Sequence, residues 1–188
     1  MVFNSSALGG FLDGKELEKL GGAWELIGGY GRNGGWSDTR AQNRVRALAE
    51  YRGVLYAGLG AADSEVWKLD EGRWIQVGGG GILGSWKGRS ETSYSADVVS
   101  SPNYTAAWVN SLLADPEGDM LYAGLKQAEG GAQLWCFNGK RWIQIGGTGK
   151  SKYGDWDSRI YDNVYTLLWH NDALYAGLLG KLPPSSSK

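Results

Sequence analysis

Two residue types that often carry chemistry are nearly absent from this sequence of 188 residues. The single cysteine, Cys136, excludes a disulfide within one chain, and its apolar surroundings predict a small buried hydrophobic side chain. The single histidine, His170, excludes a metal site built from several histidines of one chain. His170 lies in a turn-like segment, where we expect it to be exposed and to take no part in function. The sequence therefore predicts no metal ion and no cofactor.

An excess of one charge and a long hydrophobic run are also missing. With 19 basic and 20 acidic residues the formal net charge is −1, whereas nucleic-acid binders usually carry a basic excess, so we expect no nucleic-acid partner. No apolar run reaches the roughly 18 residues of a membrane-spanning helix, so no membrane partner is expected. The first ten residues lack a basic region followed by an apolar one. A cytoplasmic location is the default expectation, although a mature secreted protein would look the same.

Proline is rare, with four residues, and 42% of the residues are hydrophobic, which excludes a disordered composition. What the chain has in abundance is glycine, at 31 residues, together with ten tryptophans and ten tyrosines. Glycine suits tight turns, and the aromatic side chains supply large apolar areas with polar tips. This composition favours a folded domain of short strands and glycine-rich turns.

Three motifs recur in a fixed order, which is the signature of a repeat architecture. The sequence Leu-Tyr-Ala-Gly-Leu begins at Leu55, Leu121 and Leu174. A second motif, Trp-x-x-φ-Gly-Gly, begins at Trp24, Trp74 and Trp142. A further tryptophan follows each pair of glycines, at Trp36, Trp86 and Trp156. Five identical residues in three places are not a chance match, so the chain contains an internal repeat.

One complete repeat contains four runs of four to six residues, too short to favour helices. The first repeat predicts strands at 45–50, 54–59, 65–69 and 73–77, and the second at 109–114, 120–125, 133–137 and 141–145. Hairpin signals such as Asn138-Gly139 separate the runs. Several runs, residues 54–59 among them, are apolar on both faces and must be covered on both sides. Blades stacked around the axis of a β-propeller supply that covering.

The two ends of the chain carry complementary parts of the repeat. We expect an all-β fold with a single propeller domain at 1–180, made of a half-blade at about 7–36, blades at 45–86 and 109–156, and a half-blade at 164–178. A disordered tail follows at 181–188. These parts give about three blades, whereas propellers typically need about four to eight. Two chains are therefore expected to form a six-bladed homodimeric ring through their half-blades, and the alternative is a fragment of a longer propeller.

The repeat wording resembles two groups of known proteins. Kelch-type propellers use a comparable vocabulary of Gly-Gly, Tyr and Trp. Closer in wording are bacterial repeat proteins that read "LYAG…VW-x-x-D/N-G-x-W-x-Q-V/I-G-G", which the chain is similar to over about residues 20–178. This resemblance implies a propeller fold and no particular activity. Residues 67–74 are loosely similar to the Trp-Asp-Gly-x-Gly-Trp repeats of small fucose-binding lectins, some of which also assemble six-bladed rings.

The candidate site residues lie in the segments that connect one repeat to the next. Each connection pairs a tryptophan, which offers a flat face for a sugar or a cation, with an arginine, whose planar fork suits hydroxyls or carboxylates. One connection, residues 87–108, is longer than the others, and long loops on rigid scaffolds are commonly functional. The predicted ligand-binding residues are Trp36, Arg40, Trp86, Arg89, Tyr94, Asn103, Tyr104, Trp108, Trp156 and Arg159. The alternative is that the three tryptophans pack between blades and the long loop is a tolerated insertion.

Signs of catalysis are few, so an enzyme is the less favoured class and no catalytic residue is predicted. The segment 115–119 has the composition of a cation loop, but Pro116 and Gly118 favour a plain turn. The favoured function is a non-catalytic ligand-binding module, for carbohydrate by analogy with the lectins. One alternative is a protein-interaction scaffold that uses residues 87–108. The other is a hydrolase or lyase with carboxylates converging on the propeller axis.

Overall fold

The computed structural model of the chain describes residues 26–29, 31–36, 44–61, 64–87, 107–127, 131–147, 155–157 and 160–180. These residues form an all-β structure in which every paired strand is antiparallel to its neighbours. Two short 3₁₀ turns, η1 (Arg32–Gly34) and η2 (Ile82–Gly84), follow the glycine pairs. Most of the expected N-terminal half-blade and the expected tail at 181–188 lie outside the described residues.

The strands fall into two four-stranded units and one hairpin. Unit 1 comprises β1 (Val45–Tyr51), β2 (Val54–Ala61), β3 (Ser64–Asp70) and β4 (Arg73–Gly78). Unit 2 comprises β5 (Ala107–Ala114), β6 (Leu121–Gln127), β7 (Gly131–Phe137) and β8 (Trp142–Gly146). The terminal hairpin comprises β9 (Tyr161–His170) and β10 (Ala173–Gly180). The strands predicted for the two complete repeats and the C-terminal hairpin are confirmed and extend by one to three residues at an end, whereas residues 26–29, from the fourth-strand motif of the expected N-terminal half-blade, form no strand.

Each unit is an up-and-down meander, because every strand pairs with the next one along the chain. Two of the tight turns use a pair of residues with positive φ, namely Arg52 with Gly53 and Glu71 with Gly72. This is the backbone of a type I′ turn, whose twist matches that of the flanking strands. The sequence signals for hairpins at these positions are therefore confirmed.

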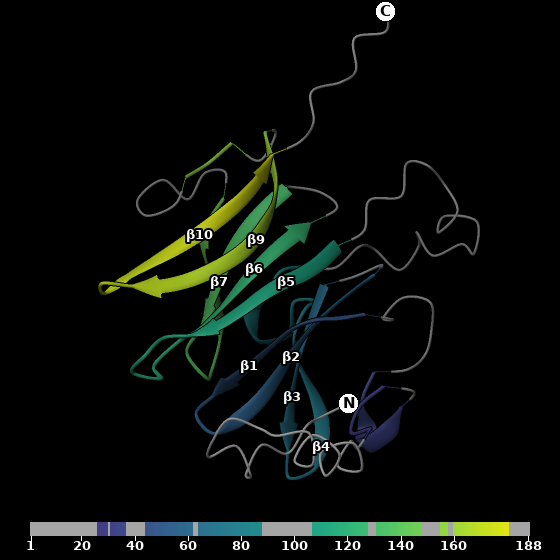
Figure 1. The fold of residues 1–188 in the computed structure, drawn as a ribbon. Helices are drawn as coiled ribbons and strands as arrows, with labels where there is room; N and C mark the ends of the chain where they lie inside the picture. The colour runs from purple at the N-terminus through teal and green to yellow at the C-terminus, as the bar shows by residue number, and fades with distance from the viewer. Residues whose placement is uncertain are drawn as a thin grey trace, which may run out of the picture.

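Backbone pairing also links the units into one curled, half-barrel sheet (Figure 1). The end of β2 pairs with the start of β5, at Gly60 and Trp108, and β6 pairs with β9, at Lys126 and Asn163. Seven strands follow one another in the order β10-β9-β6-β5-β2-β3-β4. The first strands of successive repeats, β1, β5 and β9, consequently lie next to one another.

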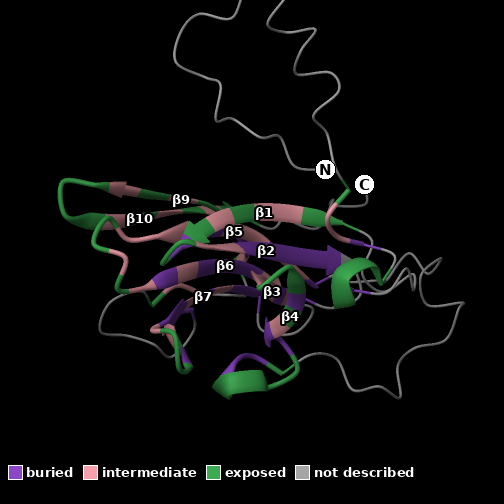
Figure 2. Ribbon diagram, turned by 90° about the horizontal axis from the view of Figure 1, so that it is seen from below, coloured by how far each residue is buried: buried purple, intermediate pink, exposed green. Residues whose placement is uncertain are grey.

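The glycine of the Leu-Tyr-Ala-Gly-Leu motif allows successive repeats to approach closely. A Cβ atom on Gly58 would lie 2.7 Å from Cγ1 of Val109, and one on Gly124 would lie 2.7 Å from Cγ1 of Val164. Any side chain at these two positions would push the next repeat away. Both valines are fully buried. Figure 2 shows the outcome, with burial concentrated in β2 and exposure along β9 and β10.

Candidate binding site

The first strand of each repeat contains a β-bulge at the same place. In β1, Val45 pairs with Leu59 and Ala47 with Gly58, so Arg46 is the extra residue. The same shift makes Asn110 the extra residue of β5 and Tyr165 the extra residue of β9. A bulge leaves one residue out of the strand pairing and redirects its side chain. Three repeats thus present three different polar side chains from one equivalent position.

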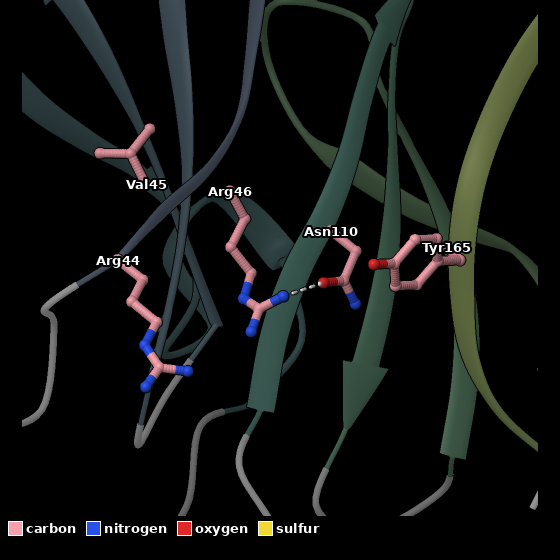
Figure 3. Close-up of a pocket in the computed structure, with 5 residues that line it drawn as sticks. All are labelled: Arg44, Val45, Arg46, Asn110 and Tyr165. Carbon is pink, nitrogen blue, oxygen red and sulfur yellow. Dashed lines mark hydrogen bonds between the residues drawn. The ribbon is translucent and has the colours of Figure 1, made fainter.

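These three bulge residues line a single pocket, which we call the bulge pocket. Its volume is about 600 Å³, and Arg44 and Val45 complete its lining. Figure 3 shows the Arg46 side chain from β1 beside Asn110, the Arg44 side chain on the far side of Arg46, and the hydroxyl of Tyr165 pointing toward Asn110. The pocket therefore takes side chains from three strands that are far apart in the sequence.

Arg46 is held in place by its neighbours. Its Nη1 donates a hydrogen bond of 3.1 Å to Oδ1 of Asn110, and its guanidinium lies 3.7 Å from the centroid of the Trp108 ring. Asn110 in turn donates from Nδ2 to Oδ1 of the buried Asn163 over 2.6 Å. Nε of Arg46 is buried and meets no acceptor in the part of the chain that the structure describes. A guanidinium fixed by these contacts is preorganised to bind an acceptor from outside through its other N–H groups.

The described lining of the bulge pocket carries positive charge without a compensating negative charge. Burial lowers the pKa of Arg46, the nearby charge of Arg44 lowers it further, and Tyr165 acts in the opposite direction. Arginine still keeps its proton at neutral pH. Among the described residues the lining contains no carboxylate, and neither arginine forms an ion pair there. The pocket is therefore positive and incompletely neutralised.

Of the residues predicted from sequence, Trp108 lies nearest to the bulge pocket. Its ring is stacked between the guanidinium of Arg46 and the ammonium of Lys126, whose Nζ lies 5.1 Å from the ring centroid. Lys126 is also paired with Asp162 over 3.2 Å. Trp108 thus holds the guanidinium of Arg46 in position through a cation–π contact.

The tryptophans of the connecting segments occupy the junctions between repeats. Trp36 packs edge to face on Trp67 and Trp74, with ring centroids 6.0 and 5.1 Å apart. The same arrangement recurs one repeat later, where Trp86 packs on Trp135 and Trp142 at 5.5 and 5.2 Å. Trp36 and Trp86 are buried, and this arrangement corresponds to the packing role that the sequence left open.

Hydrogen bonds from indole groups tie these junctions together. Trp86 donates to the carbonyl of Ser64 over 2.8 Å, and Trp156 donates to the equivalent carbonyl of Ala132 over 3.0 Å. Between units, Trp142 of β8 donates to the carbonyl of Val77 over 2.8 Å. The remaining predicted site residues lie outside the described residues: Arg40, Arg89, Tyr94, Asn103, Tyr104 and Arg159. Ligand binding by the Trp/Arg pairs therefore stays a prediction.

The turn at 115–119 uses its carboxylate for its own backbone. Oδ1 and Oδ2 of Asp115 accept hydrogen bonds from the amides of Asp119 and Met120, at 2.7 and 3.2 Å. This is the plain turn that Pro116 and Gly118 indicate. Within the described ranges, no three histidine, cysteine or acidic residues are grouped to hold a metal ion. His170 is exposed and Cys136 is buried, both as expected, and burial raises the pKa of the Cys136 thiol.

The sequence analysis missed Arg44, Arg46, Asn110 and Tyr165. A usable signal was present, because a polar or tyrosine residue follows the valine at the same repeat position in Val45, Val109 and Val164. Alignment of the repeats on this valine places Arg46, Asn110 and Tyr165 in one column, whereas alignment on Leu-Tyr-Ala-Gly-Leu shifts Asn110 by two residues because the turn before Leu121 is longer. The bulge that turns this column toward a common pocket depends on strand register, which the motifs alone do not reveal.

Comparison of the chain with protein-family models, with curated proteins and with solved structures found no significant match. In the segments that the structure describes, no helix is long and apolar enough to cross a lipid bilayer.

Proposed function

We propose that units 1 and 2 and the terminal hairpin are blades of a β-propeller and that two copies of the chain complete a six-bladed ring. Support comes from equivalent positions in successive repeats. Val109 and Val164 are each 0% exposed because they pack on Gly58 and Gly124, whereas the equivalent Val45 is 47% exposed. At the other end, the three nearest atoms to the place of a Cβ atom on Gly177 all belong to Thr166, and no valine of a following repeat is among them. Val45 of a second copy, docked on Gly177, would repeat the internal junction.

The occupant we propose is a second copy because the exposed surfaces complement each other. Within the described ranges no third or fourth strand pairs with the hairpin β9–β10, and residues 26–29 carry the end of a fourth-strand motif. Pairing would also cover exposed apolar side chains on both edges, Leu48 on β1 and Tyr175 and Leu179 on β10. Sedimentation equilibrium tests this proposal. A mass of twice 20.3 kDa is expected, and a monodisperse monomer or a ring closed by additional repeats of a longer chain would contradict it.

We propose that the chain is a non-catalytic binding module and that the bulge pocket is its ligand site. One observation carries this proposal: equivalent bulges on three strands bring Arg46, Asn110 and Tyr165 to the same pocket. Strand bulges are conformationally costly and are concentrated beside functional sites. Binding is proposed ahead of catalysis because the described lining supplies no carboxylate for general acid–base chemistry.

Thermal shift measurements with a panel of acidic and neutral small molecules test the site. A ligand that binds the folded state raises the melting temperature by mass action. We expect at least one ligand to stabilise the protein and to lose its effect in Asn110→Ala, while Arg141→Ala, on an exposed residue of the β7–β8 turn, behaves as the parent protein. Stabilisation that Asn110→Ala leaves unchanged would place the ligand elsewhere and contradict the proposal. The scaffold that uses residues 87–108 stays an untested prediction.

A further inference from the structure

The donors of the bulge pocket point to a ligand with an oxyanion. Arg46 on β1 and Arg44, which immediately precedes β1, both line the pocket and meet no carboxylate within the described residues. One N–H of Nη1 of Arg46 is engaged by Asn110 and its Nε is buried, which leaves Nη2 and the second N–H of Nη1 as donors for a ligand. A guanidinium fork binds a carboxylate or a phosphate through two parallel hydrogen bonds, and such charge-assisted bonds are the strongest available to the chain.

The remaining lining points to hydroxyl groups beside that anion. The amide of Asn110 and the hydroxyl of Tyr165 can each donate and accept hydrogen bonds, so they match ligand hydroxyls, which also do both. A bare inorganic anion accepts only and would offer no donor to the hydroxyl oxygen of Tyr165. Tyr165 is 55% exposed, which also leaves part of its ring free for the carbon-bound hydrogens of a sugar.

The size of the bulge pocket fits a small organic molecule. Its volume of about 600 Å³ falls within the range of roughly 300–1,000 Å³ that is typical of small-molecule sites. A single anion such as acetate would fill a small part of it. A monosaccharide that carries one acidic group has both the size and the mixture of groups that the lining presents.

We infer that the bulge pocket binds an acidic monosaccharide of the uronate class. The carboxylate lies against the guanidinium groups of Arg46 and Arg44, and ring hydroxyls meet Asn110 and Tyr165. This inference rests on the proposed function, because it names the ligand class of that same site. It differs from the Trp/Arg sites predicted from sequence, since the sugar is held by residues on or beside the first strands of the repeats, β1, β5 and β9.

Isothermal titration calorimetry with the full chain tests the ligand class. The probes are D-glucuronate, D-galacturonate, D-mannuronate, D-glucose, D-glucose 6-phosphate and acetate. We expect at least one uronate to bind ten or more times tighter than glucose and acetate, and to weaken as salt concentration rises. Equal binding of glucose, preference for glucose 6-phosphate, or failure of all three uronates would each overturn the inference.

Variants connect the binding to the residues. Arg46→Lys keeps the charge and removes the fork, so we expect uronate affinity to fall about tenfold or more, and Tyr165→Phe, which removes one hydroxyl, to lower it by a smaller factor. Arg141→Ala is the matched control, and tryptophan fluorescence verifies that each variant is folded. Full uronate affinity in Arg46→Lys would overturn the inference. If no uronate binds but another ligand does so in an Asn110-dependent way, the proposed function stands and only its ligand class falls.

Discussion

The junction between units 1 and 2 and the free edge of β1 present the same repeat surface, once covered and once uncovered. Leu112 of β5 is 9% exposed at the junction, whereas the equivalent Leu48 of β1 is 55% exposed. Both leucines pair with the alanine of a Leu-Tyr-Ala-Gly-Leu motif, so they occupy equivalent positions within their own repeats. The difference comes from the neighbouring repeat. A single repeat of this kind cannot bury its own apolar surface, which makes the neighbour part of its core.

The difference between the covered Leu112 and the exposed Leu48 predicts that a substitution at Leu48 has its largest effect on dimer formation. Leu48→Asp places a charge on the uncovered edge of β1, and a charge buried without a partner is costly, so we expect the variant to sediment as a monomer of 20.3 kDa. Ile75→Asp, on an exposed residue of β4, is the matched control and should leave the mass unchanged. A Leu48→Asp protein that remains dimeric would remove this edge from the interface.

The next effect concerns the free energy of unfolding within one chain. In the Leu48→Asp background, Val109→Ala should cost about 2 kcal/mol, because it opens a cavity beside Gly58. Val45→Ala at the uncovered equivalent should cost less than about 0.5 kcal/mol. Urea denaturation followed by tryptophan fluorescence measures both. Equal costs would show that burial at the junction does not distinguish these valines.

A smaller effect is expected for the hydrogen bond that joins units 1 and 2. Trp142→Phe removes the donor to the carbonyl of Val77 and leaves that carbonyl without this partner, so unfolding should become easier by about 1–2 kcal/mol. Trp67 is the control, because its indole donates to Glu65 on its own strand, and Trp67→Phe should cost less. If thermal unfolding shows a larger loss of stability for Trp67→Phe than for Trp142→Phe, the hydrogen bond between the units is not the more stabilising of the two.

The smallest effect is a loss of stability at alkaline pH. Burial is the largest factor that raises the pKa values of Tyr51, Tyr56 and Tyr122 above 10.0. Below pH 10 both states keep these protons and the contribution to stability is complete. As pH rises further, the unfolded chain loses its protons first, so stability falls until the folded pKa values are passed. Tyr51→Phe should flatten this decline in melting curves recorded from pH 8 to 11, and an unchanged decline would exclude Tyr51 as a contributor.

The strands were predictable from sequence because their signals are local. Alternating apolar residues and turn pairs such as Glu71-Gly72 fix where a strand ends, and these do not depend on the rest of the chain. The role of Trp86 was left between packing and binding, because an aromatic ring suits both. Its burial against Trp135 and Trp142 depends on how two repeats meet, which one repeat does not encode.

The bulge pocket was not predictable in the same way. Arg46 follows an apolar residue in a strand, where a polar side chain usually faces solvent. Only the pairing of Val45 with Leu59 and of Ala47 with Gly58 shows that Arg46 is an inserted residue. Its contact with Asn110 then joins positions 64 residues apart in the sequence. Register and long-range contact together define the pocket, and neither is visible in a local pattern.

In the first strand of each repeat, different positions join the repeats and line the bulge pocket. The valine and glycine that join successive repeats recur, as in Val109 on Gly58 and Val164 on Gly124, whereas the bulge residues in the same strands are arginine, asparagine and tyrosine. A bulge residue is left out of the strand pairing, so a change of its side chain removes no hydrogen bond of the regular ladder. The bulge position therefore differs among the three repeats, while the valine and glycine that join the repeats recur. Substitution of the bulge residue in one repeat at a time is a way to change the ligand specificity of the proposed site without redesign of the fold.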